Sequence, residues 1–273
     1  EYITRIGSQS LFYKDNNGKE KEINNDLKEG SKTYENKSNY YDLILPKKGE
    51  AVEIKGGGYT FTLSPVFASL ENGVREKNAI RYNDVADGID IQYTAFSDSV
   101  KEDIILMKPS KLKNFRYEIK ANKSGDTLLY KIEDNRLKIY ERNGEKDQLV
   151  YSVSAPYMTD NNGDACNGIV LNVTKKDGKV YLDITPNEKW LNAPERAYPV
   201  RIDPTISLTR ENMEFGVIEN GSGGGGAAGS HIEHLGNSYL YAGYEDGSLV
   251  GISDIRYQPV SYTHLTLPTS DLV

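Results

Sequence analysis

The sequence predicts an all-β protein of packed antiparallel sheets, β-sandwich-like and with little helix. Along most of the first 205 residues, apolar and polar residues alternate in short runs. This alternation places successive side chains on opposite faces of a strand. Asn-Gly and Asp-Gly pairs separate the runs, and these pairs tolerate the backbone of tight turns. No stretch keeps an apolar period of 3.6 residues over three turns, so long helices are not expected.

The expected strands follow one another along the chain. Alternating runs occupy residues 52–54, 59–63, 80–82, 89–93, 115–119, 128–132, 137–139, 169–173 and 180–184. The last two runs flank Asp177-Gly178 and predict a hairpin. Residues 187–196 predict a short helical turn around Trp190 and no more. Residues 22–39 are polar and poor in apolar side chains, which is typical of a loop or an edge region.

Tyrosine dominates the aromatic residues, with 20 Tyr against 6 Phe and 1 Trp. A tyrosine ring packs on a pleated surface while its hydroxyl reaches a polar partner or water. We therefore expect the tyrosines on sheet faces. The alternative is a set of exposed rings on which sugars stack.

The charge balance indicates which partners to expect. The net charge is −7, and the lysines and arginines are scattered rather than clustered. Nucleic-acid binding requires a concentrated basic surface, so the sequence predicts no nucleic-acid partner. No apolar run approaches the roughly 18 residues of a spanning helix, which predicts no membrane span. Cys166 is the only cysteine and excludes a disulfide framework within the chain.

Two changes in composition suggest domain boundaries. Residues 1–205 are expected to form a β-rich module, with a division into two sub-lobes near residues 75–110 as an alternative. Residues 206–259 would begin a second β-domain, interrupted by a glycine-rich insertion at residues 221–230. Residues 260–273 resemble translated sequencing-adapter read-through, so we expect a non-native tail there.

Three carboxylates on neighbouring predicted strands are the best candidates for glycan hydrolysis. Asp90, Glu102 and Asp103 lie near an aromatic strand, and glycosidases use two carboxyl groups about 5–9.5 Å apart, one with a raised pKa. The competing interpretation places all three on the solvent faces of alternating strands, and we favour it.

Other motifs give weaker signals. Asp160 to Asp164 is similar to the first half of a calcium loop, but the twelfth position is Leu171 rather than Glu. His231 and His234 lack the further ligands that zinc requires. The glycines at 221–226 lack the Lys-Ser/Thr of a phosphate-binding loop. We expect Trp190 to be buried against Tyr198 and Pro199. We assign no catalytic, cofactor-binding or metal-ligating residue and no cofactor.

Four stretches resemble a β-rich module found ahead of DNRLRE-type domains in secreted bacterial proteins of the RHS/YD-repeat and wall-associated kind. They are residues 80–93, 99–106, 154–160 and 190–205, in the order and spacing of that family. The last stretch holds an alternating strand that ends at Pro204. Residues 237–244 resemble the opening of the DNRLRE-type domain itself.

The resemblance implies a non-enzymatic structural module of a large exported bacterial surface or toxin-type protein. Its partners would be other domains of the same polypeptide and, through the downstream domain, a cell-wall or extracellular polysaccharide. The expected location is extracellular or at the cell surface, with the signal peptide lost by truncation. A carbohydrate-binding module is the alternative function, and a glycan-active enzyme is a third.

Overall fold

The computed structural model describes residues 12–15, 17–49, 51–122, 128–143 and 146–208, and four short strands beyond residue 215. The chain divides into two compact units, residues 1–211 and 212–273. The glycine-rich insertion at 221–230, residues 237–243 and the tail at 260–273 lie outside the described residues. The boundary at residue 205 and the two sub-lobes stay predictions.

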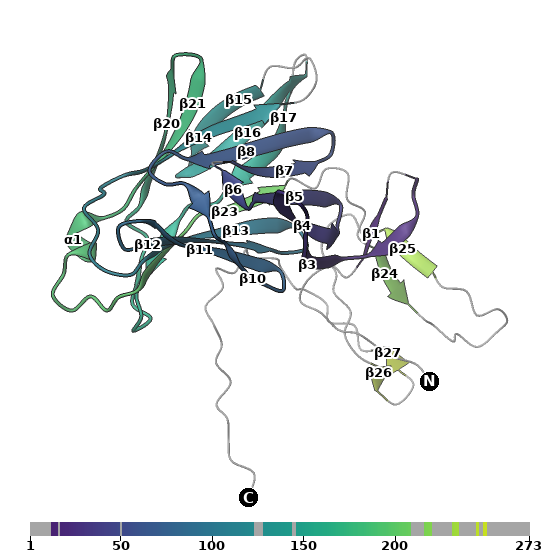
Figure 1. Cartoon of the computed structure of the whole chain (residues 1–273). Helices are drawn as coiled ribbons and strands as arrows, with labels where there is room; N and C mark the ends of the chain where they lie inside the picture. The colour runs from purple at the N-terminus through teal and green to yellow at the C-terminus, as the bar shows by residue number, and fades with distance from the viewer. Residues whose placement is uncertain are drawn as a thin grey trace, which may run out of the picture. The chain divides into compact units, whose positions relative to one another are not determined.

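The first unit confirms the predicted fold class, because two large antiparallel sheets form a sandwich-like structure (Figure 1). One sheet has eight strands. Its strands, in spatial order, are β20 (Val170–Lys176), β21 (Lys179–Thr185), β14 (Phe115–Asn122), β8 (Tyr59–Pro65), β7 (Val52–Gly56), β5 (Tyr41–Pro46), β4 (Thr33–Ser38) and β3 (Asn24–Glu29).

The other sheet has eleven strands. Its main path runs through β10 (Val74–Glu76), β11 (Ala79–Ala86), β12 (Ile89–Ala95), β13 (Ser99–Leu106), β23 (Thr205–Leu208), β17 (Lys146–Val153), β16 (Arg136–Asn143) and β15 (Leu128–Glu133). Beside this path lie β18 (Tyr157–Thr159), β19 (Ala165–Cys166) and β22 (Val200–Asp203).

The remaining elements are short. The predicted helical turn is confirmed as α1 (Glu188–Leu191), where the side chain of Asn187 accepts a hydrogen bond from the Trp190 amide at 3.1 Å. No helix among the described residues is long and apolar enough to cross a membrane. The small strand pairs are β1 (Phe12–Lys14) with β2 (Glu20–Glu22), and β6 (Lys48–Gly49) with β9 (Leu70–Glu71); in the second unit, β24 (Gly216–Glu219) pairs with β25 (His231–His234), and β26 (Tyr244–Glu245) with β27 (Ser248–Leu249).

Alternation along the strands builds the core. In β8, Phe61 and Leu63 are buried while the residues between them are partly exposed. The hairpin of β20 and β21 is confirmed, and its turn has positive φ at Asp177 (52°) and Gly178 (76°). An asparagine or aspartate followed by glycine suits this turn because both positions require a left-handed backbone.

A set of tyrosines connects the two sheets through the core. Each ring is wholly or partly buried, and each hydroxyl forms a hydrogen bond with the opposite sheet. These bonds join Tyr41 to the Phe96 carbonyl (2.6 Å), Tyr82 to the Pro46 carbonyl (2.6 Å), Tyr151 to the Ile54 carbonyl (3.2 Å), Tyr59 to the Glu141 carboxylate (2.5 Å) and Tyr130 to the Ala121 amide (2.7 Å). We call these residues the cross-sheet tyrosines.

Polar contacts close the two sides of the sandwich. On one side, the Leu27 amide donates to the Lys77 carbonyl at 2.7 Å, and Arg75 donates to the Leu27 carbonyl. On the other side, the Asn135 side chain donates to the Ile169 carbonyl at 2.7 Å and accepts from the Leu171 amide at 2.8 Å. These bonds satisfy backbone groups of β3 and β20 that an edge strand leaves open.

The strand that completes the larger sheet comes last in the unit. β22 and then β23 run antiparallel along β13, from the pair Val200–Leu106 to the pair Ser207–Ser99. The other side of β22 pairs with β18, and the other side of β23 pairs with β17. Residues 200–208 therefore lie inside the sheet, with a partner strand on each side of β22 and of β23.

Candidate functional site

The predicted carboxylates lie on β12 and β13 but point to two sides of the sheet. Asp90 and Asp103 lie on the outer face, whereas Glu102 points into the core. Their exposed fractions are only 4%, 3% and 1%. The favoured interpretation, three solvent-face residues, is therefore wrong. The structure also does not gather them as a hydrolytic pair, because strand alternation separates Glu102 from the other two.

Asp90 is held by its neighbours on β11. One carboxylate oxygen accepts from Arg81 Nε and Nη2 at 2.9 and 2.5 Å. The other oxygen accepts from the Asp84 amide at 2.8 Å. Donors engage both oxygens, so this carboxylate stabilises the local shape of β11 and is not available as a free base.

A second charged group spans β13 and β22 on the outer face. The Lys101 ammonium lies 3.0 Å from Asp103 Oδ1 and 3.1 Å from Asp203 Oδ2. Arg201 lies 3.8 Å from the other oxygen of Asp103. Burial raises the pKa of Asp103, and also raises the pKa of the adjacent Tyr157 to about 12. Burial opposes the charge of Lys101, but its two aspartates outweigh this effect and raise its pKa.

This charged group is a closed ion network. The Lys101 ammonium bridges two nearly buried carboxylates, and Arg201 supplies a second positive charge, so charge is balanced locally and little carboxylate surface meets solvent. Sequence analysis missed Lys101, Asp203 and Arg201, because β13 and β22 are about 100 residues apart in the chain. The one signal in the sequence at this place was Pro204, which predicted the end of a strand.

A third polar group joins two loops near α1. Asp160 accepts from Arg196 Nη1 at 2.6 Å and from the Ala197 amide at 3.2 Å through one oxygen. Its other oxygen accepts from the amides of Asn162 and Asp164 at 2.9 and 3.0 Å. Amide and guanidinium donors thus occupy the Asp160 carboxylate, which acts as the cap of a turn rather than as half of a calcium loop.

Trp190 packs differently from the expectation. It is half-buried, and the Arg196 guanidinium stacks on its ring, 3.6 Å from the centroid. The Tyr198 hydroxyl donates to the Leu191 carbonyl at 3.0 Å. Full burial against Tyr198 and Pro199 was therefore wrong, because a cation–π contact lets the indole keep one side near solvent.

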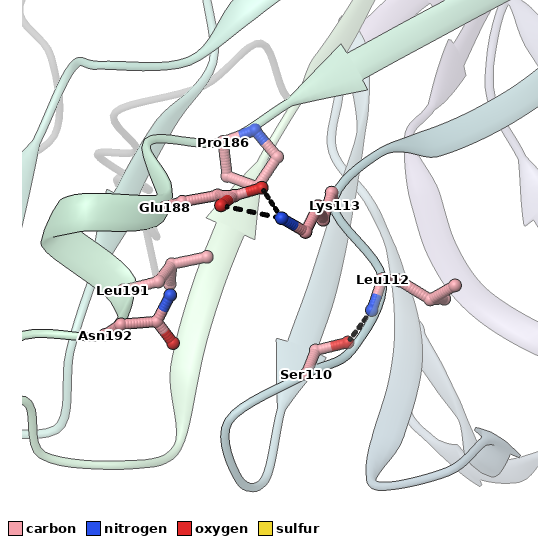
Figure 2. Close-up of a pocket in the computed structure, with 7 residues that line it drawn as sticks. All are labelled: Ser110, Leu112, Lys113, Pro186, Glu188, Leu191 and Asn192. Carbon is pink, nitrogen blue, oxygen red and sulfur yellow. Dashed lines mark hydrogen bonds and ion pairs between the residues drawn. The ribbon is translucent and has the colours of Figure 1, made fainter.

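A small hollow beside α1 also has polar walls (Figure 2). Its volume is about 100 Å³, against a lower bound of roughly 300 Å³ for small-molecule sites. Lys113 and Glu188 form an ion pair of 3.1 Å across it. The lining residues are Ser110, Leu112, Lys113, Pro186, Glu188, Leu191 and Asn192. The hollow contains none of the predicted carboxylates.

The described residues contain no group of three or more His, Cys, Asp and Glu that could hold a metal ion. His231 and His234 lie on β25, and Cys166 lies on β19 with a free thiol. The glycines at 221–226 lie outside the described residues.

Curated relatives of this chain are tRNA nucleases by name. The chain is 33% identical over 171 residues to the tRNA3(Ser)-specific nuclease WapA of Bacillus spizizenii, covering 60% of this chain and 7% of the relative. It is 32% identical over 170 residues to the tRNA nuclease WapA of Bacillus subtilis strain 168, with the same coverage. It is 33% identical over 147 residues to the tRNA(Glu)-specific nuclease WapA of Bacillus subtilis subsp. natto, covering 51% and 6%.

No family model matches the chain, and no solved structure matches it. The chain spans only about 7% of the length of the curated relatives that it matches. The similarity therefore concerns one part of much longer proteins.

The relatives contradict the function and the partners expected from the sequence. A non-enzymatic structural or carbohydrate-binding module was expected, but proteins similar to this chain are named as nucleases. The absence of a nucleic-acid partner was expected, but the names specify tRNA. The charge argument failed for a physical reason: the net charge of this chain does not report the surface of relatives that are many times longer.

Proposed function

We propose that this chain is a segment of a tRNA-cleaving polypeptide. The supporting observation is the identity of 33% over 171 residues to a tRNA-specific nuclease. Because the chain covers 7% of that protein, the proposal concerns the polypeptide to which the segment belongs. We infer the substrate class, tRNA, from the same similarity.

The test uses the complete polypeptide that contains these residues. Purified protein is incubated with total tRNA, with and without divalent cations, and the products are separated on a denaturing gel. We expect cleavage of tRNA and little cleavage of ribosomal RNA fragments of similar length. Intact tRNA at an excess of protein under all these conditions would refute the proposal.

A parallel incubation with residues 1–273 alone locates the activity. Cleavage by this chain assigns the active groups to it, and cleavage only by the complete polypeptide assigns them to the remainder. Both results agree with the proposal. We expect cleavage only by the complete polypeptide, because among the described residues Glu102 is enclosed and the outer carboxylates are held in ion networks.

We also propose that the polypeptide is exported and that residues 206–259 begin a DNRLRE-type domain. These proposals rest on the resemblance of residues 80–205 and 237–244 to modules of secreted bacterial proteins. Fractionation of cells with an antibody against residues 1–205 tests the first, with detection at the cell surface or in the medium as the expected result. Recovery only from the cytosol would contradict it.

A further inference from the structure

Glu102 lies where the two sheets pack against each other. Its side chain projects from β13 into the core and is 1% exposed. The Tyr93 hydroxyl, on β12 of the same sheet, donates to Glu102 Oε1 at 2.7 Å. Tyr117, on β14 of the opposite sheet, is fully buried, and its hydroxyl forms no hydrogen bond with a described residue. The Glu102 carboxyl group is therefore enclosed between the two sheets and accepts a hydrogen bond from its own sheet.

No cation forms an ion pair with Glu102 among the described residues. The nearest ammonium in sequence, that of Lys101, lies on the outer face and pairs with Asp103 and Asp203. The titratable groups that act on Glu102 are Tyr93, Tyr117, Asp103 and Asp203. The tyrosines are neutral and the aspartates are anionic, so none of them compensates a negative charge on Glu102.

An ionised carboxylate without a counter-ion is costly in an apolar core, whereas a protonated carboxyl group is a neutral donor and acceptor. We propose that the Glu102 carboxyl group is a proton-sensitive clasp: the two sheets pack closely around it when it is protonated and loosen when it is ionised. The proton leaves to solvent as the sheets loosen and returns as they close. This device is independent of the tRNA-cleaving activity proposed above.

The electrostatics place the transition in the neutral range. Burial raises the pKa of Glu102 to about 7, although the Tyr93 hydroxyl acts in the opposite direction by stabilising the carboxylate. Burial also raises the pKa of both tyrosines well above the usual value, so they stay neutral over this range. A carboxyl group with a raised pKa in the folded state stabilises the fold below its unfolded pKa, and this contribution is lost as pH rises through the folded pKa.

Urea unfolding of the 273-residue chain between pH 5 and pH 9 tests the clasp. In the wild-type chain, we expect the unfolding equilibrium constant to rise roughly a hundredfold over this range because of Glu102. Glu102→Gln keeps the shape and an acceptor for the Tyr93 hydroxyl but cannot ionise, so this rise should disappear. Glu53→Gln is the matched control, since Glu53 is 38% exposed and paired with Lys55 on β7; it should follow the wild type.

A second measurement does not depend on the folding of a variant. The side-chain carboxyl carbon of Glu102, assigned by NMR through the backbone, should titrate near pH 7 in the wild-type chain. A titration midpoint below pH 5 would overturn the clasp. It would also be overturned if wild type and Glu102→Gln, both folded, showed the same dependence of stability on pH.

Discussion

The cross-sheet tyrosines explain why this chain uses tyrosine so much more than phenylalanine. A buried ring contributes apolar area, and the hydroxyl satisfies a polar group that the opposite sheet would otherwise bury alone. Tyr82 and Tyr151 both donate to backbone carbonyls in this way. Phenylalanine would fill the same volume but leave these carbonyls without that donor.

Replacement of one cross-sheet hydroxyl should therefore reduce stability without changing the fold. In Tyr82→Phe, the buried Pro46 carbonyl loses its donor, which lies at 2.6 Å. We expect a loss of about 1–2 kcal/mol in the free energy of unfolding, measured by urea denaturation. Tyr181→Phe is the control because the Tyr181 ring contacts Arg116 from outside the core. Equal losses in both variants would contradict the role of the hydroxyl.

Single residues also show the limit of prediction from sequence. Alternation correctly placed Phe61 and Leu63 in the core, because one face of β8 packs on the other sheet. The same alternation places Glu102 in the core, but a charged side chain is not expected there, so its burial was not predicted. Prediction also failed for Trp190, since a stack with Arg196 depends on how two loops meet.

At the scale of elements, the order of strands departs most from the order of the chain. The hairpins are local, and turn residues such as Asp177 and Gly178 predict them well. The pairing of β23 with β13 and with β17 joins segments about 100 and about 50 residues apart, respectively. No period or turn signal encodes such a partner, so the sequence predicted the strands and the fold class but not this arrangement.

The inserted strand should be sensitive to loss of a single amide donor. Ile206 is buried and lies opposite Val100 on one side and Val153 on the other. Proline at this position clashes with a central ladder, so Ile206→Pro should abolish cooperative unfolding, as followed by circular dichroism. Val170→Pro, at the exposed start of the edge strand β20, should retain it. A cooperative transition in Ile206→Pro would show that β23 is dispensable.

At the scale of the whole molecule, ionisable groups should limit stability from both sides of the pH range. Donors from Arg116 lower the pKa of Asp183. Burial would raise the pKa of Asp160, but the Ala197 amide and Arg196 outweigh it and lower this pKa. Carboxylates with lowered pKa values stabilise the fold above their unfolded pKa, and this contribution is lost as pH falls through the folded value. The raised pKa of Glu102 has the opposite effect, because its contribution to stability is lost as pH rises.

Thermal unfolding between pH 2 and pH 9 should therefore give the highest melting temperature at about pH 5 to 6. Differential scanning calorimetry measures the curve. Asp183→Asn should lower the melting temperature near pH 6 and flatten the acidic side, leaving the alkaline side as in the wild type. A melting temperature that rises steadily up to pH 8 would contradict this balance of groups.

The late position of β23 has a consequence for biosynthesis. While the ribosome extends the nascent chain, β13 and β17 have both been made but still lack the neighbour that lies between them. Until β23 emerges, the facing edges of β13 and β17 offer unpaired backbone groups to any other extended polypeptide nearby. A holding chaperone, or a channel that keeps the segment unfolded, would protect the molecule most during this interval.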